Sequence, residues 1–287
     1  MTTTDITHES SVPTADPGAL TVPRWTALAV LARRRLLLSA HTPREIVVPL
    51  LTPILFALVI APALATMVTS TNGLDYQTYV AVGTVGLLVP LSCMFAGIGV
   101  IVDRDNGARR ELLAAPVPRS LMVGGNFVVA IAVSTMQLAA LMVAAIARGA
   151  DFDTSVSGVA WFVGGAYVFI AVSYAIAEIM ANRIPSQEEY VGATPAVAIL
   201  PWFLAGSLFP ISALPGVLSG FAKILPLTHA LALMRYGLLD RHATGLHDIW
   251  GMSNADQMAF LSLGVVTGWA VVLTFVSVRV FGRAAVQ

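Results

Sequence analysis

Few side chains in this sequence have the types and spacing that catalysis requires. A zinc metalloprotease uses His-Glu-x-x-His on one helix, but no second histidine follows His8 and Glu9 at that spacing. The turn that presents a nucleophilic serine, Gly-x-Ser-x-Gly, does not occur. A phosphate-binding loop needs a lysine directly after a glycine, whereas the only lysine, Lys223, follows Ala222. The sequence therefore contains no catalytic or nucleotide-binding motif of its own, and we expect a chain that is not an enzyme.

Polar residues inside apolar stretches are few. Glu178 and Gln137 are the two that stand out. A carboxylate in lipid is costly and marks a functional candidate, such as a proton site or a partner for an arginine. The alternative, which we favour, is that Glu178 reaches the cytoplasmic interface and pairs with Arg183. His229 and Arg235 are expected near the outer interface, where headgroups or water solvate them.

The composition indicates which solvent surrounds the chain. Of 287 residues, 57% are hydrophobic and 11% are charged, whereas a soluble domain carries about 25% charged residues. Too few polar side chains are present to cover a water-facing surface of this size. The 16 basic and 16 acidic residues cancel, so no global field attracts nucleic acid, and the single Cys93 excludes an internal disulfide. The fold class predicted is an all-α integral membrane protein.

Six apolar segments meet or approach the roughly 20 residues that a helix needs to cross the hydrocarbon layer. Their apolar runs are continuous rather than alternating, which excludes a transmembrane barrel. The predicted spans are 46–67, 79–102, 121–147, 159–180, 191–209 and 259–280.

The basic residues predict the orientation. With a cytoplasmic N-terminus, 12 of the 16 basic residues fall on the inner side, as the positive-inside rule requires. The other four basic residues, Arg148, Lys223, Arg235 and Arg241, fall on the outer side. We therefore expect a multi-pass protein of the plasma membrane with both termini in the cytoplasm, and residues 45–283 as its six-span domain.

Two different segments precede the first span. Residues 1–23 are rich in Thr, Ser, Asp and Pro, without an apolar run, which is typical of a disordered tail. Residues 24–44 combine leucines at helical spacing with Arg33, Arg34 and Arg35. This pattern predicts an amphipathic helix in the membrane interface whose arginines contact lipid headgroups. Alternatively, the arginines are a basic flank that only orients the first span.

Two connections are more than plain loops. The first, 103–119, reads DRDNGARRELLAAPVPR and is expected on the cytoplasmic side. The second, 210–256, follows the fifth span and contains apolar pieces that are too short to cross and are broken by Pro and Gly. Such pieces are typical of re-entrant or interfacial helices.

The same two connections carry a family resemblance. Residues 111–119 resemble the loop between spans two and three of ABC type-2 permeases, although Ala115 replaces the usual Thr. Residues 206–216, followed by Pro226, Ala230 and Arg235, are similar to the second signature of that family, a proline-broken pair of external helices. Within the family, the chain looks most like export permeases of the daunorubicin/doxorubicin-resistance type.

The resemblance implies a half-transporter that pairs with a second permease copy or a paralogue. Two separate ABC ATPase subunits would dock on its cytoplasmic side, and ATP and Mg would be bound there rather than by this chain. A short coupling helix would meet the ATPase through Arg104, Asp105, Arg109, Arg110, Glu111, Leu112 and Leu113. The interfacial helix with Arg33, Arg34 and Arg35 would move with it.

Two further sets of residues follow from the resemblance. Spans two and five would line the substrate path, with Leu88, Leu91, Phe95, Trp202, Phe203 and Ser207. The external re-entrant region would include Phe209, Pro210, Pro215, Pro226, His229 and Arg235. Such apolar walls suit drugs, polyketides or lipids, and the expected function is export of hydrophobic or amphipathic compounds, as in multidrug export and antibiotic resistance. The alternatives are a lipo-oligosaccharide or cell-envelope lipid exporter, or a membrane scaffold that transports nothing.

Overall fold

The computed structural model describes residues 23–40, 51, 54–60, 62–63, 76–115, 117–152, 155–239 and 242–284. The predicted tail and most of the first predicted span lie outside these residues, so neither is tested. Every regular element in the described part of the chain is helical. An all-helical membrane protein is therefore the architecture that the structure supports.

Among the described residues, four helices are long and apolar enough to cross a membrane. They have 28 to 30 residues each, and at about 1.5 Å per residue each exceeds the roughly 30 Å of the hydrocarbon layer. Each contains one predicted span and extends beyond it at one or both ends. They are α4 (Tyr76–Asp105), α6 (Arg119–Ala147), α7 (Val156–Arg183) and α12 (Ala255–Ala284).

Helix α8 (Gln187–Leu204) corresponds to the fifth predicted span but differs at both ends. It begins earlier, because Ser186 caps it by accepting a hydrogen bond from the backbone N–H of Glu189. It ends five residues before the predicted end, because the chain turns at Gly206, whose φ is +80°. The polar residues in its first turn lower the mean hydropathy of α8, so α8 is not among the four helices that are apolar enough to cross a membrane. The count of six spans therefore stays a prediction.

The region after α8 folds into short helices, as the broken apolar pieces indicated. It contains a 3₁₀ turn (Ile211–Ala213), α9 (Gly216–Ala222), α10 (Pro226–Leu238) and α11 (Thr244–Trp250). Helices α9 and α10 are bent by 79° at the break, and together they are apolar enough to count as one broken span or a re-entrant pair.

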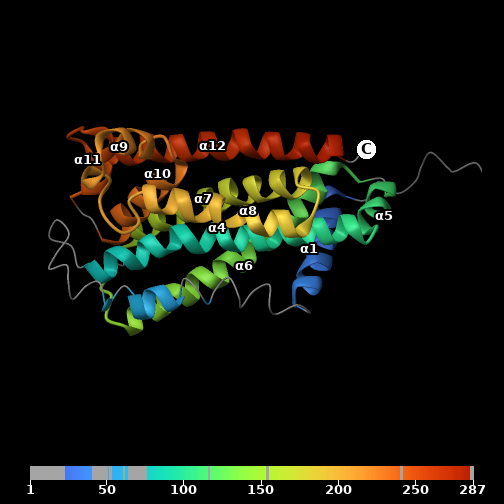
Figure 1. Cartoon of the computed structure of the whole chain (residues 1–287), viewed down its shortest axis with the longest axis horizontal. Coiled ribbons are helices and arrows are strands. Elements are labelled where there is room, and N and C mark those ends of the chain that lie inside the picture. The colour runs from blue at the N-terminus through green and yellow to red at the C-terminus, as the bar shows by residue number, and fades with distance from the viewer. Residues whose placement is uncertain are drawn as a thin grey trace, which may run out of the picture.

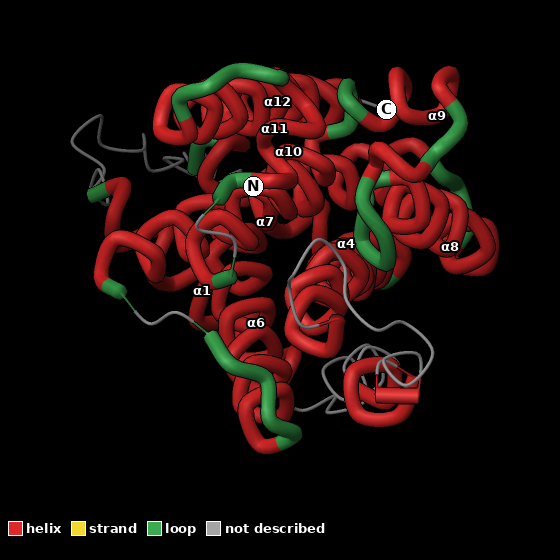
Figure 2. The backbone as a smooth tube through the Cα atoms, turned by 90° about the vertical axis from the view of Figure 1, so that its left-hand side faces the viewer, coloured by secondary structure: helices red, strands yellow, loops and turns green. Residues whose placement is uncertain are grey.

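Helix α7 is central to the bundle and packs against α4, α10 and α12 (Figures 1 and 2). Its approach to α10 depends on two glycines. A Cβ on Gly158 would lie 2.1 Å from the carbonyl oxygen of Gly237, and a Cβ on Gly237 would lie 2.3 Å from that of Gly158. Only glycine at both positions permits this backbone contact.

One end of the bundle carries α1 (Arg24–Ala40), α5 (Ala108–Ala114) and the C-terminal end of α12, and the other carries α9, α10 and α11 (Figure 1). Helix α1 runs across the bundle axis and packs on α6 (Figure 1). There the Cβ of Leu31 lies 2.8 Å from where a Cβ of Gly125 would be, so this glycine lets the two helices approach. The crossing direction of α1 suits a helix that lies along a membrane surface.

Candidate functional site

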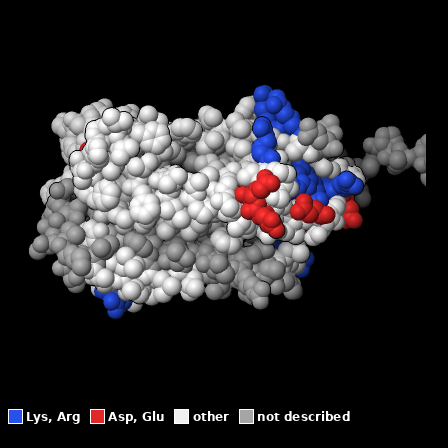
Figure 3. Space-filling model, viewed as in Figure 1, with Lys and Arg blue, Asp and Glu red and all other residues white. Residues whose placement is uncertain are grey.

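On the face shown in Figure 3, charged side chains gather at the end of the bundle that carries α5, whereas the rest of that face is almost free of them. Hydrogen bonds fix which segments meet there. Arg109 of α5 and Arg119 of α6 donate to the carbonyls of Phe281 and Gly282 at the end of α12. The predicted coupling segment and the C-terminal end of α12 therefore share one surface.

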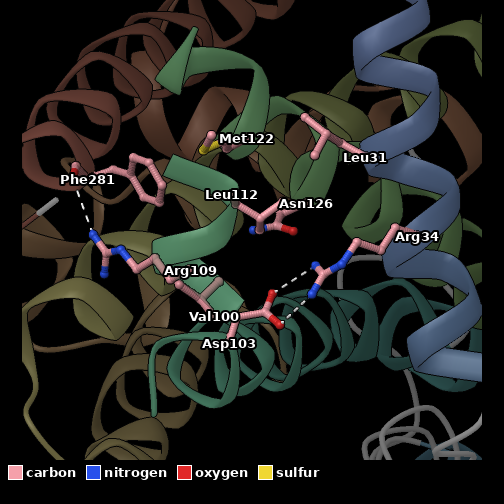
Figure 4. A pocket seen from close by; sticks show the side chains of 9 residues that line it. All are labelled: Leu31, Arg34, Val100, Asp103, Arg109, Leu112, Met122, Asn126 and Phe281. Carbon is pink, nitrogen blue, oxygen red and sulfur yellow. Dashed lines mark hydrogen bonds and ion pairs between the residues drawn. The ribbon is translucent and has the colours of Figure 1, made fainter. Parts of the chain in front are cut away.

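Asp103, near the end of α4, holds α1 in place. Arg34 donates to both of its carboxylate oxygens at 3.2 and 3.3 Å (Figure 4). Arg35 approaches the same carboxylate at 3.7 Å and is buried, with an exposed fraction of 7%. Its guanidinium occupies the space beside Gly99, where a Cβ would lie 1.0 Å from Nη2. Of the three predicted interfacial arginines, Arg34 and Arg35 thus contact Asp103, and only Arg33 is exposed.

Arg104 joins α4 to the end of α7. Its guanidinium donates to the carbonyls of Ala181, Ile184 and Pro185 at 2.7 to 3.2 Å. Those carbonyls lie at the C-terminus of α7, where backbone acceptors lack partners within the helix. The same side chain pairs with Asp105 at 3.1 Å. Arg104 therefore ties two helices together.

Helix α5 has a buried face and an exposed face. Arg109 is 9% exposed and lies over the ring of Phe281, 4.8 Å from its centroid; this burial lowers the pKa of its guanidinium from the ordinary value. Leu112 lines the same pocket as Arg109 and Asp103 (Figure 4), and Leu113 is half-buried.

The exposed face of α5 carries Arg110 and Glu111. Asp105, in the turn before α5, is exposed as well. Two opposite charges on a short helix at the end of the bundle form a surface that a second protein can recognise and bind. Of the predicted coupling residues, the structure leaves Asp105, Arg110 and Glu111 accessible and packs Arg104, Arg109, Leu112 and Leu113 against the bundle to different degrees.

The two polar residues noted inside the spans are both fully buried. Glu178 accepts hydrogen bonds from the hydroxyl of Tyr174 at 2.8 Å and the amide of Asn182 at 3.1 Å. The interpretation that it pairs with Arg183 is wrong, because these neighbours on α7 satisfy the carboxylate instead. Gln137 of α6 accepts a hydrogen bond from Ser92 of α4, which joins two spans.

The predicted path residues lie on both sides of the α4–α8 contact. Leu88, Trp202 and Ser207 are buried inside the chain, and the indole of Trp202 donates to the carbonyl of Gly83 at 2.8 Å. Leu91 and Phe95 are half-buried, and Phe203 is 46% exposed. The assignment of these six residues to a substrate path stays a prediction.

The predicted solvation of His229 and Arg235 is wrong, because the structure buries both side chains. Arg235 is 5% exposed and donates to the carbonyls of Gly206 at 2.7 Å and Ser207 at 2.9 Å. Its guanidinium stacks on the ring of Tyr79, 3.5 Å from the centroid. Arg235 is therefore an internal tie between α10, α4 and the turn after α8.

His229 has two partners. Its Nε2 contacts the carbonyl of Lys223 at 2.9 Å and its Nδ1 contacts the hydroxyl of Ser262 at 3.1 Å. A carbonyl only accepts, so Nε2 carries the proton and Nδ1 accepts from Ser262. The other predicted residues of this region are more open: Pro210 and Pro226 are half-buried, and Phe209 and Pro215 are exposed.

Sequence reasoning missed Asp103, Phe281 and Tyr79 as partners of the arginines. Asp103 had a signal, since it is the first charged residue after the second predicted span, and Arg33, Arg34 and Arg35 are expected on the same side of the membrane. Phe281 and Tyr79 had none, because they are 172 and 156 residues from their partners in sequence and look like ordinary span residues.

Comparison with known proteins agrees with this architecture. The chain is similar to two proteins called Nodulation protein J. It is 24% identical to the one from Sinorhizobium fredii over 84% of this chain and 92% of the relative. It is 24% identical to the one from Rhizobium meliloti over 76% of this chain and 83% of the relative. The family model described as ABC-2 type transporter matches residues 26–239. This match covers most of the chain, including α1, α4, α5 and α10, and the chain therefore belongs to the ABC-2 type transporter family.

Proposed function

We propose that this chain is the membrane subunit of an ATP-driven exporter that moves hydrophobic or amphipathic compounds outward across the plasma membrane. The observation that carries the proposal is α5, which presents Arg110 and Glu111 to the surrounding solution at the charged end of the bundle. Membership of the ABC-2 family supports it, because such a membrane subunit works with an ATPase on another chain.

The contacts of α5 suggest how force from an ATPase enters the bundle. Arg109 and Leu112 hold its inner face against α12 and α4, so a push on Arg110 and Glu111 moves α5 as a rigid body. Asp103 transmits the motion from α4 to α1 through Arg34. Movement of α4 then changes its spacing from α8, the helix pair that would line the substrate path.

The assembly we propose contains two ABC ATPase subunits and a second copy of this permease or a paralogue. ATP and Mg would be bound by the ATPase subunits. Helix α1 would lie on the cytoplasmic leaflet, with the exposed Arg33 facing lipid headgroups.

Exposed apolar side chains on α8 favour an apolar cargo. Val191, Leu200 and Phe203 are 48%, 60% and 46% exposed. Such a surface suits drugs, polyketides or lipids better than sugars, and an export permease of the daunorubicin/doxorubicin-resistance type would use it in this way. A lipo-oligosaccharide or a cell-envelope lipid fits it equally through its apolar part.

A charge-reversal experiment tests the docking of the ATPase. We expect the permease purified from its native host to retain an ATPase subunit, and the double variant Arg110→Glu/Glu111→Arg to lose that subunit while still inserting into the membrane. The matched control is Arg283→Glu, an exposed charge at the same end but on α12. Reversal of Arg109 is avoided, because a carboxylate buried against Phe281 would disturb folding.

Two readouts decide the outcome. We expect ATPase recovery and substrate-stimulated ATP hydrolysis to be abolished in the α5 variant and unchanged in Arg283→Glu. Full recovery and full stimulation in the α5 variant would contradict docking at α5. Recovery of the wild-type permease without any ATPase, even after cross-linking, would contradict the proposed function itself.

A further inference from the structure

A cavity of about 180 Å³ lies between α4, α7, α8 and the N-terminal end of α10. One face of α7 forms a wall with Phe169, Val172 and Ile176, at the spacing that places residues above one another on a helix. Helix α8 forms the opposite wall with Ala198 and Pro201. None of the six predicted path residues lines this cavity, so it is a separate feature of the protomer.

The walls of the cavity decide the chemistry of its occupant. Ser173 supplies the one side-chain hydroxyl among the lining residues, and all the others are apolar. An engineered apolar cavity of about 150 Å³ stays dry and binds benzene. A larger cavity with walls of the same kind therefore favours a hydrocarbon group over water.

The cavity exists because α7 and α8 both pack on α4 but scarcely on each other. The side of α8 that faces the gap is made of short or ring-closed side chains, notably Ala198 and Pro201, which do not fill it. Pro90 of α4 lies on the floor and is buried. The gap between α7 and α8 thus follows from how these two helices pack on α4, and the start of α10 lines one end of it.

The mouth of the cavity opens to the surface of the bundle. Ile176, Val197 and Pro201 are half-buried, in contrast to the buried Val172 and Ala198. Pro90 and Val172 lie near the middle of α4 and α7. In a chain that spans the membrane, the solvent at that depth is the hydrocarbon of lipid tails.

We propose that this cavity binds a segment of one acyl chain of a membrane phospholipid. The chain enters between α7 and α8 and fills the space down to Pro90. The exposed Lys223 is two residues from Leu225, which lines the end of the cavity formed by α10. Its ammonium group can meet the phosphate of the headgroup, which favours a phospholipid over an uncharged hydrocarbon.

Photolabelling tests the proposal in vesicles that contain the permease alone, so the result does not depend on any ATPase or on transport. The probe is phosphatidylglycerol with a diazirine in the middle of one acyl chain. We expect the label to concentrate on the peptides that carry Val172 and Ala198. The variant Ala198→Phe fills the cavity and lowers this labelling by about tenfold. The control Ala196→Phe places the same ring two residues away on the exposed face of α8 and leaves the labelling unchanged.

Two further variants keep the proposal falsifiable if Ala198→Phe does not fold. Ile176→Trp narrows the mouth of the cavity and is expected to lower the labelling as well. Lys223→Gln is expected to lower the labelling by roughly two- to threefold, because a single exposed charge contact contributes little binding energy. Label that is no denser at Val172 and Ala198 than at the exposed Val271 and Val272 of α12 would overturn the proposal. So would unchanged labelling in well-folded Ala198→Phe and Ile176→Trp.

Discussion

Arg235 shows how this protein places charge in its apolar interior. The guanidinium has carbonyl acceptors in the turn after α8 and an aromatic ring of α4 beneath it. Those carbonyls lie where α8 has ended, so they have no helical partner and need a donor from elsewhere. One side chain of α10 thereby satisfies the end of one helix and anchors a second.

We expect Arg235→Lys to destabilise the protein although the charge is kept. The planar guanidinium donates to three carbonyls and stacks on the ring of Tyr79 at once, whereas an ammonium group cannot do so. Loss of one or two charged hydrogen bonds costs about 2–5 kcal/mol. The measurement is the thermal midpoint of the purified protein in detergent, with Arg148→Lys, an exposed arginine of the same end, as the control. Equal midpoints for the two variants would contradict the role of Arg235 as an internal tie.

The sequence could identify Arg235 as a signature residue but not its environment. Hydropathy predicts that charged residues lie outside the spans, but it does not say whether protein or solvent surrounds them there: Arg35, Arg109 and Arg235 are only 7%, 9% and 5% exposed. Each donates to a backbone carbonyl that is 29 to 172 residues away. Every residue has a backbone carbonyl whatever its type, so a sequence does not show which carbonyl accepts a hydrogen bond from a given arginine.

At the scale of the elements, the contact between α7 and α10 leaves the least room for a larger side chain. The atoms that a new Cβ on Gly237 would meet are the carbonyl oxygen of Gly158 at 2.3 Å and the backbone nitrogen of Phe162 at 2.8 Å. Backbone atoms cannot rotate away as a side chain can. The two helices must therefore separate if either glycine is replaced.

Gly237→Ala is expected to destabilise the protein by about 1–3 kcal/mol, as overpacking of a close contact usually does. Gly220→Ala is the matched control, because a Cβ there meets nothing within 4 Å. That change in exposed helix α9 should be neutral or stabilising by roughly 0.5–1 kcal/mol, since alanine favours the helix. Opposite shifts of the thermal midpoint check the prediction, and a Gly237→Ala protein as stable as Gly220→Ala would refute the tight α7–α10 contact.

The long apolar helices were predictable, whereas the ends of α8 were not. An apolar run such as that of α12 admits no other structure in lipid, because every backbone group must be paired within the segment. Helix α8 ends at Leu204 although Leu208 and Phe209 are as apolar as Phe203 and Leu204. The turn at Gly206 depends on the donors Arg235 and Tyr79, which are remote in sequence.

On the scale of the whole molecule, the two ends of the bundle differ in kind. One end carries α1, α5 and the basic ends of α4, α7 and α12, tied by Arg34, Arg104 and Arg109. The opposite end is closed by α9, α10 and α11; of these, α10 packs on α7 and α12, and α11 packs on α12. A transporter driven from one side needs this division between an end that receives motion and an end that releases cargo.

The positive-inside rule assigns the α5 end to the cytoplasm, and two single cysteines test the assignment. Asn106→Cys lies in the exposed turn before α5, and Ser253→Cys lies in the exposed loop before α12 at the opposite end. The native Cys93 is buried, so it contributes no surface label. On intact cells, we expect an impermeant maleimide to label Ser253→Cys alone, and in inverted vesicles Asn106→Cys alone, with both labelled after detergent is added. The reverse pattern would place α5 outside the cell, where no cytoplasmic ATPase could reach Arg110 and Glu111. That result would contradict the proposed coupling.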